Sequence, residues 1–231
     1  MIYDLEDKLI ILVGDVHGSF YSITELCKQF QNIYILQVGD FGIGFEQNKL
    51  KEQRILKNLA ESLIRSNNHL FVIRGNHDNP AYFNDQTIEE RITFLSDYSI
   101  LNQNGKKILC VGGGISIDRV HRKIGTSYWV DEVFVLDEQK IVEADVLVTH
   151  VAPKEFPLIT LQSNSLVKTF CKVDHKLDSD LKRESNLVQS LVNLSKCKKH
   201  YFGHFHVSMK YDTSSCIYTC LDIDETKQLE W

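Results

Sequence analysis

Little in this 231-residue sequence suits a membrane or an oxidising compartment. No segment approaches the ~20 apolar residues that span a bilayer, and Met1 is followed by an acidic stretch rather than by a basic and apolar one. The six cysteines are scattered without Cys-x-x-Cys spacing, which disfavours both a thiolate zinc motif and a disulfide framework. These absences predict a cytoplasmic protein without a membrane partner, in which the cysteines are small buried side chains.

Basic residues are too few for a surface that binds long nucleic acids. The 26 lysines and arginines are outnumbered by 31 aspartates and glutamates, so the net charge is −5 and the pI is about 6.0. A nucleic-acid backbone is held through many phosphate contacts, which disfavours this partner, whereas a local phosphate site remains compatible with the charge. The length and the hydrophobic content of 43% predict a single domain over residues 1–231.

Three short apolar runs end in polar residues flanked by glycine. Residues 8–13, 33–38 and 70–73 are typical of buried strands, and helical patterns follow the first two. Alternating strands and helices predict a largely parallel sheet, and the exits of its strands lie at one edge, where α/β enzymes bind ligands. The polar residues at these exits are Asp15, His17, Asp40, Arg74, Asn76, His77 and Asp78.

Helices are predicted over residues 20–30, 47–65, 131–140 and 179–197. Ser22 and Glu25 have the spacing of a capping box for the first of these helices, and Asp131 suits the N-cap of the third. Residues 152–176 contain two prolines and only weak periodicity, which predicts an excursion over the site that acts as a lid or as a dimer contact.

The second half of the chain predicts a second sheet. Strands are expected near residues 91–95, 99–101 and 107–111, and Asn104-Gly105 is typical of a hairpin turn. A later apolar strand at 146–149 ends at His150, and the final polar exit reads Gly203-His204-Phe205-His206.

The polar exits supply oxygen and nitrogen ligands. Carboxylate, imidazole and amide groups suit manganese, iron, zinc or nickel, and the absence of thiolates argues against a structural zinc site. There are enough such groups for two divalent ions, an arrangement that recurs in the hydrolysis of phosphate esters. The candidate ligands are Asp15, His17, Asp40, Asn76, His150, His204 and His206.

This order of motifs, at these spacings, strongly resembles the calcineurin-like metallophosphoesterase superfamily over nearly the whole chain. The resemblance implies an α/β fold, a four-layer αββα sandwich of two mixed β-sheets, with a hydroxide bridging two metal ions. It implies that Asp15, His17 and His206 bind one metal, that Asn76, His150 and His204 bind the other, and that Asp40 bridges them. It also implies that His77 is the catalytic group that protonates the leaving oxygen, as suits an imidazole.

The chain departs from the Ser/Thr protein phosphatases of the superfamily. They continue the second motif as Gly-Asp-x-x-Asp-Arg-Gly, whereas this chain has Gly39-Asp40-Phe41-Gly42-Ile43-Gly44. The missing aspartate orients the catalytic histidine, so Asp78 or Glu46 is expected to take that role. Arg74 matches an arginine that binds phosphate in those phosphatases.

The loop at 112–129 supplies further candidates for substrate binding. Arg119 and Arg122 are expected to replace the arginine of the Gly-Asp-x-x-Asp-Arg-Gly motif, a phosphate anchor that this chain lacks, and Tyr128 or Trp129 to stack on a base or phenol ring. The plainer alternative is a glycine turn with arginines facing solvent and an aromatic pair that holds the loop down.

The predicted function is a metal-dependent phosphoesterase that hydrolyses phosphate monoesters or diesters, most readily small or nucleotide-like substrates. The alternatives are a nuclease or a Ser/Thr protein phosphatase of the same superfamily, and a metal-binding scaffold without catalysis.

Overall fold

The computed structural model describes residues 1–46, 48–157 and 165–231. Within these residues one sheet has six strands in the order β13-β2-β3-β4-β6-β5. The four central strands are parallel, and β13 and β5 are antiparallel at the two edges. The strands are β2 Ile10–Val13, β3 Tyr34–Gln37, β4 His69–Val72, β5 Gln86–Ile88, β6 Ile92–Phe94 and β13 Thr226–Gln228.

The other sheet has seven strands in the described part of the chain, in the order β1-β7-β8-β9-β10-β12-β11. Strands β8, β9, β10 and β12 are parallel, and the predicted hairpin at Asn104-Gly105 joins antiparallel β7 and β8. The strands are β1 Ile2–Leu5, β7 Ser99–Gln103, β8 Lys106–Val111, β9 Val146–Thr149, β10 Lys199–Phe202, β11 Met209–Asp212 and β12 Ile217–Cys220.

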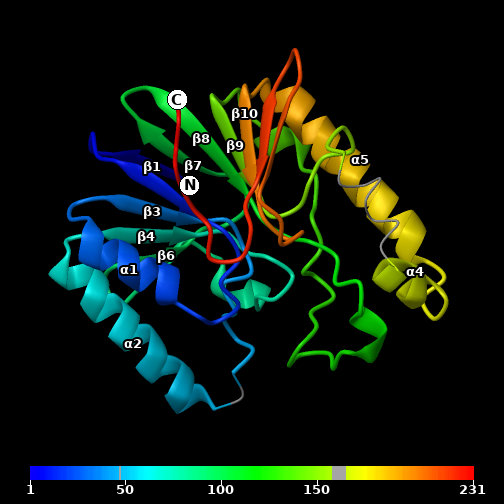
Figure 1. The fold of residues 1–231 in the computed structure, drawn as a ribbon, viewed down its shortest axis with the longest axis horizontal. Helices are drawn as coiled ribbons and strands as arrows, with labels where there is room; N and C mark the ends of the chain where they lie inside the picture. Colours follow the sequence, from blue (N-terminus) through cyan, green and yellow to red (C-terminus); the bar gives the residue numbers. More distant parts are fainter. Residues whose placement is uncertain (47, 158–164) are drawn as a thin grey trace.

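Helices cover the outer faces of both sheets (Figure 1). On one side lie α1 Tyr21–Gln29 and α2 Lys49–Arg65, and on the other lie α4 Ser165–Cys171 and α5 Leu177–Ser195. Short 3₁₀ turns occur at Pro80–Tyr82, Arg119–His121 and Glu138–Lys140. The two mixed sheets with flanking helices confirm the predicted αββα sandwich.

The alternation of side chains along β2 shows why the sheets stack. Ile11 and Val13 pack in the cluster with α2, whereas Ile10 and Leu12 pack in the cluster between the two sheets. Successive residues of a strand point to opposite faces, so an entirely apolar strand is buried on both. The same alternation holds in β8 and β9, whose other faces pack against α5.

Two helix predictions were wrong in detail. Residues 131–140 form only the 3₁₀ turn at Glu138–Lys140, because the carbonyls of residues 131–133 accept hydrogen bonds from Arg74 and cannot serve a helix. Helix α1 begins before Ser22, with Phe20 at the N-cap and no side-chain cap, and the Ser22 hydroxyl donates to Asp224 at 2.7 Å. The edge strands β1, β5 and β13 were not predicted; each has three or four residues, too few for a clear alternating pattern.

The predicted excursion at 152–176 lies partly outside the described residues, at 158–164, and its described part includes α4. Among the helices that the structure describes, none is both long and apolar enough to cross a bilayer. All six cysteines are free thiols, and the buried Sγ atoms of Cys197 and Cys216 lie 4.0 Å apart.

Candidate metal centre

The predicted ligands converge where the parallel strands of both sheets end. One group of donors contains Asp15, His17, Asp40 and His206, and a second contains Asp40, His150 and His204. Within each group the ligand atoms lie within 4.8 Å of one another, and Asp40 belongs to both. A carboxylate shared by two clusters is the arrangement expected of a bridge between two cations.

Asn76 joins the second group through its side-chain oxygen. Its Oδ1 lies 3.1 Å from Nε2 of His150, and its Nδ2 donates to the hydroxyl of Ser116 at 3.1 Å. This second bond turns the amide so that its oxygen faces the cluster. The backbone N–H of Ser116 in turn donates to the buried carboxylate of Glu132 at 2.9 Å. Sequence reasoning missed Ser116 and Glu132, whose only signal was the glycine-rich loop that precedes them.

The geometry of the imidazoles fits bound cations. Nε2 of His17 lies 3.1 Å from Nε2 of His206, and Nδ1 of His204 lies 3.2 Å from Nε2 of His150. Two ring nitrogens at this distance share either a proton or a positive ion, since their lone pairs otherwise repel. Together with the carboxylates, this donor set suits a borderline divalent ion.

The backbone at the ligands is held in an uncommon conformation. His17, Asp40, His204 and His206 have φ angles of 46°, 57°, 69° and 52°, in the left-handed region that residues other than glycine rarely adopt. Such strain persists only where surrounding contacts impose it, and it clusters at functional sites. At Asp40 those contacts include the amides of Val16 and His17, which donate to its carbonyl.

Glycines beside the ligands make room for the carboxylates. A Cβ on Gly203 would lie 2.0 Å from Oδ1 of Asp15, and a Cβ on Gly75 would lie 2.1 Å from Oδ1 of Asp40. Both distances are far below contact, so no side chain fits at either position. The glycines that flank the motifs are therefore required by the close approach of two strand exits, as well as by the turns themselves.

Neighbouring charges shift the pKa values of the buried histidines of the site. Burial alone lowers the pKa of His150, but the carboxylate of Asp40, 3.2 Å away, outweighs it and raises that pKa to about 10. Burial and the positive charge of His150 lower the pKa of His204 to about 3. A place that draws a proton so strongly between Asp40 and His150 also favours a cation.

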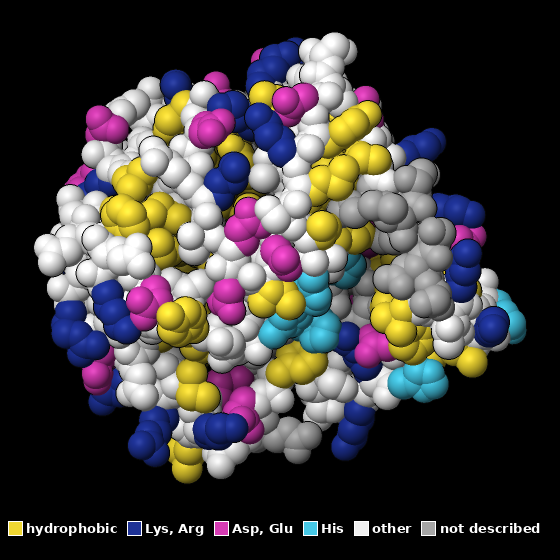
Figure 2. All heavy atoms as spheres, in the orientation of Figure 1, with side chains coloured by type: hydrophobic (Ala, Val, Ile, Leu, Met, Phe, Trp, Pro, Cys, Tyr) yellow, Lys and Arg dark blue, Asp and Glu magenta, His cyan; other side chains and the backbone are white. Residues whose placement is uncertain are grey.

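His77 lies at the edge of the donor groups rather than among them. Its backbone N–H donates to Oδ1 of Asp40 at 2.7 Å, and its ring stacks on Phe45 with centroids 5.3 Å apart. Nε2 of His77 lies 2.8 Å from Nη2 of Arg122. Burial lowers the pKa of His77 to about 4; Asp40 opposes this effect, and Arg122 reinforces it. Figure 2 shows histidine side chains gathered near the middle of this face.

The predicted substrate-binding arginines are placed very differently from one another. Arg122 contacts His77 and pairs with Asp118 at 2.6 Å. Arg119 pairs instead with Asp174 and Asp180, both at 2.6 Å, and so ties the 112–129 loop to α5.

Arg74 is buried, and its guanidinium donates to protein acceptors in every direction. Nε and Nη2 bond to the carboxylate of Asp97, and Nη1 and Nη2 bond to the carbonyls of residues 131, 132 and 133. Its five N–H groups are thereby satisfied. The prediction that Arg74 binds phosphate does not fit this placement, because the side chain anchors the segment after the glycine loop.

Asp78 does not orient His77 as expected. Its buried carboxylate accepts hydrogen bonds from the backbone N–H groups of Gly42, Ile43, Phe41 and Gly75, at 2.7 to 3.2 Å. It therefore joins the exit of β3 to the exit of β4. Glu46 pairs with Lys51 at 2.5 Å.

The aromatic side chains of the loop pack on the site rather than reaching into solvent. The ring of Trp129 meets Phe45 edge to face, with centroids 5.0 Å apart, and Phe45 stacks on His77. Tyr128 is half-buried, and its carbonyl accepts the backbone N–H of Gly125. The packing of Trp129 matches the plainer alternative, in which an aromatic side chain holds the loop down.

This fold and its two clusters of donors at the strand exits define a class of metal-dependent hydrolases. The chain belongs to the calcineurin-like phosphoesterase family, whose model matches residues 8–208. It is a hydrolase that acts on phosphoric ester bonds, as the resemblance of its motifs predicted.

Solved structures agree with this fold. A dimetal phosphatase from Danio rerio is 12% identical, with a TM-score of 0.56 over 94% of this chain and 88% of that one. The protein TT1561 of Thermus thermophilus is 11% identical, with a TM-score of 0.54 over 94% of this chain and 90% of that one. At these identities the likeness concerns the fold alone. A comparison with curated proteins finds no match.

Proposed function

We propose that this protein hydrolyses small phosphate monoesters or diesters at a site that holds two divalent ions. Asp15, His17 and His206 bind one ion, Asn76, His150 and His204 bind the other, and Asp40 bridges them. The observation that carries the proposal is that Asp40 lies in both clusters of converging donor atoms. When bound, the two ions supply an activated water at neutral pH and neutralise the charge of the phosphoryl oxygens.

The residues beside the ions assist the reaction. His77 gives a proton to the leaving oxygen, and its ring is held for this by Phe45 and by the bond from its amide to Asp40. Arg122 binds a phosphoryl oxygen. In the structure its Nη2 donates to Nε2 of His77, and a bound phosphate offers stronger, charged acceptors for the same donor.

The substrate is small and carries few charges beyond its phosphate. The net charge of −5 opposes a long nucleic acid, and this chain lacks the Asp-Arg pair of the Ser/Thr protein phosphatases. The metal is manganese, iron, zinc or nickel, since each suits imidazole together with carboxylate.

The test measures release of nitrophenol from 4-nitrophenyl phosphate and from bis(4-nitrophenyl) phosphate by purified protein. Added manganese is expected to support turnover of at least one ester, chelator to abolish it, and Asp40→Asn to abolish it with manganese present. Single-stranded DNA and a phosphopeptide serve as the competing substrates. Metal-independent turnover, or no turnover of any of the four substrates, would refute the proposal.

A further inference from the structure

A cavity of about 330 Å³ adjoins the metal centre, between the segment that leads into α1, the segment after β3 and the first turns of α2. Sites for small molecules occupy about 300–1,000 Å³, so this volume suits part of a substrate. His17, a candidate metal ligand, is also one of the residues that line the cavity. Phe45 lines the cavity too, and its ring stacks on His77, so the cavity borders the site at His17 and Phe45.

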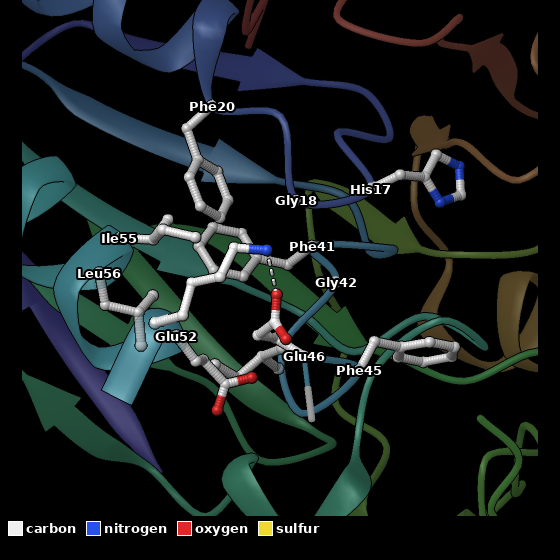
Figure 3. Close-up of a pocket in the computed structure, with 12 residues that line it drawn as sticks. His17, Gly18, Phe20, Phe41, Gly42, Phe45, Glu46, Glu52, Ile55 and Leu56 are labelled. Atoms are coloured by element: carbon white, nitrogen blue, oxygen red, sulfur yellow. Dashed lines mark hydrogen bonds and ion pairs between the residues drawn. The ribbon is translucent and has the colours of Figure 1, made fainter. Parts of the chain in front are cut away.

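The backbone of two glycines lies between the metal centre and the cavity. A Cβ on Gly42 would lie 2.7 Å from the backbone nitrogen of Gly18, so the two glycines are in close contact. Figure 3 shows Gly18 between His17 and Phe20, and Gly42 next to Phe41. The backbone N–H of Gly18 also donates to the carbonyl of Phe41 at 2.9 Å, so these two segments form a wall between the metal centre and the cavity, bordered by His17 and Phe45.

The far end of the cavity is aromatic and aliphatic. The rings of Phe20 and Phe41 lie 4.6 Å apart at an angle of 31°, and Ile55 and Leu56 approach from α2 (Figure 3). Phe41 and Leu56 are buried, whereas Phe20 and Ile55 keep partial exposure that a ligand could cover. Flat aromatic surfaces of this kind favour a flat partner.

The rim of the cavity is charged. Lys51 pairs with Glu46 across it, and the nearly buried Glu52 accepts the backbone N–H of Gly44 at 2.7 Å, which holds the segment in place. Two carboxylates disfavour a second anionic group in this space. An ammonium and a carboxylate side by side suit the edge of an uncharged ring that has both an acceptor and a donor.

We propose that this cavity, the ring pocket, holds an uncharged flat ring attached to the phosphoester substrate, with Phe20 and Ile55 against the ring, Phe41 supporting Phe20 from behind, and the Lys51–Glu46 pair at its edge. The inference rests on the proposed function, since the phosphate lies on the metal centre. It makes aryl phosphates and nucleotides the substrate class, and it assigns specificity to Phe20 and α2 rather than to the 112–129 loop.

The first test measures the binding of phenylphosphonate and methylphosphonate to manganese-loaded protein by calorimetry. Neither compound can be hydrolysed, and they differ by the ring alone. The native protein is expected to prefer phenylphosphonate by about tenfold, as stacking on aromatic side chains allows. Ile55→Trp fills the pocket and should bring the ratio close to one without weakening methylphosphonate. Ile64→Trp is the matched control, because it makes the same change at an exposed site on the same helix, outside the pocket lining.

A second variant covers the case in which Ile55→Trp does not fold. Ile55→Ala removes one wall of the pocket and should lower the preference about threefold. Equal affinities for the two phosphonates in the native protein, or a preference that neither Ile55 variant changes, would overturn the inference.

Two substrates that share the same type of leaving group distinguish a nucleobase from a simple aryl ring in the pocket. Adenosine 5′-monophosphate and ribose 5-phosphate release the same type of alkoxide, so their ratio of kcat/KM reports the base. Lys51→Met is expected to reduce this ratio if the natural ring is a base, and to leave it unchanged if the ring is a plain aryl group.

Failure of this inference is separable from failure of the proposed function. Metal-dependent turnover without any preference for the ring removes the ring pocket alone. A preference for phenylphosphonate without turnover of any ester removes the hydrolytic proposal and leaves the pocket.

Discussion

Nη2 of Arg122 lies 2.8 Å from Nε2 of His77. A guanidinium only donates, so in this arrangement Nε2 accepts and carries no proton. The catalytic proposal needs that proton, and it therefore needs Arg122 to turn to the phosphate when substrate binds. The two residues are 45 positions apart, and their contact brings the 112–129 loop to the candidate metal centre.

Replacement of Arg122 is expected to impair phosphate binding in the transition state. Arg122→Lys keeps the positive charge but loses the planar fork, and kcat/KM for 4-nitrophenyl phosphate should fall about 100-fold, the cost typical of one lost donor. Arg119→Lys is the matched control in the same loop. Because Arg119 pairs with Asp174 and Asp180, its replacement should lower thermal stability and leave kcat within about twofold. Equal losses of activity in both variants would contradict the role of Arg122.

Replacement of His77 should affect poor leaving groups most. His77→Ala removes the proton donor, and kcat for an alkyl phosphate is expected to fall by about 10²–10⁴, the usual worth of general acid catalysis. The loss for 4-nitrophenyl phosphate should be much smaller, because nitrophenolate leaves without a proton. Metal content, measured by mass spectrometry, should be unchanged. Similar losses for both esters would show that His77 acts in another way.

The two donor groups predict the metal content of each variant. Native protein loaded with manganese and freed of excess should hold two ions per chain. Asp15→Asn affects one cluster and should leave one ion, whereas Asp40→Asn affects both and should leave fewer than one. Asp7→Asn, at an exposed site near the N-terminus, provides the control. The sharing of Asp40 would be refuted by an Asp40 variant that retains both ions.

Asp78 is expected to matter for stability through its four backbone contacts. Asp78→Asn replaces one acceptor oxygen by an N–H₂ group that faces other donors, at a cost of about 2–4 kcal/mol. For a chain of this length each kcal/mol lowers Tm by about 2–4 °C, so a fall of several degrees should appear in a thermal melt. Turnover should fall as well, because the exits of β3 and β4 lose their connection. An unchanged Tm would show that these bonds carry little stability.

Glu184 on α5 predicts a dependence of stability on pH. Burial raises the pKa of this carboxyl to about 7, although backbone N–H groups of Ile115 and Phe134 oppose the shift, and its Oε1 has no hydrogen-bond partner in the described residues. With the folded pKa above the unfolded value of about 4.3, its contribution is fully present below about pH 4 and is lost as the pH rises through 7.

Glu184→Gln removes this titration. The variant should match the native protein at about pH 5 and exceed its stability at about pH 8 by about 1–2 kcal/mol, seen as a Tm several degrees higher. Glu90→Gln, at an exposed position, should show no such change between the two pH values. A Glu184 variant that is less stable at the higher pH would mean that the charged form is the favoured one.

Much of the fold was predictable because the strands that form it are locally distinctive. Largely apolar runs such as β2 and β9, each followed by a polar exit, identify strands buried on both faces. The edge strands β1 and β13 were missed, since three or four half-exposed residues show no clear period, and their pairing with β7 and β2 joins segments far apart in the chain. Arg74 was predicted to bind phosphate because the residues next to it in the sequence do not reveal that its side chain pairs with Asp97.

The sequence by itself determined which residues stand at the strand exits and that glycines accompany them. Both depend on neighbours within a few positions, where hydrophobic runs and turn residues act directly. Only the tertiary structure decided that Arg122 reaches His77, that Ser116 orients Asn76, and that a cavity adjoins His17. These relationships join segments far apart in the chain through loop conformations, which depend on packing and hydrogen bonds that no local pattern encodes.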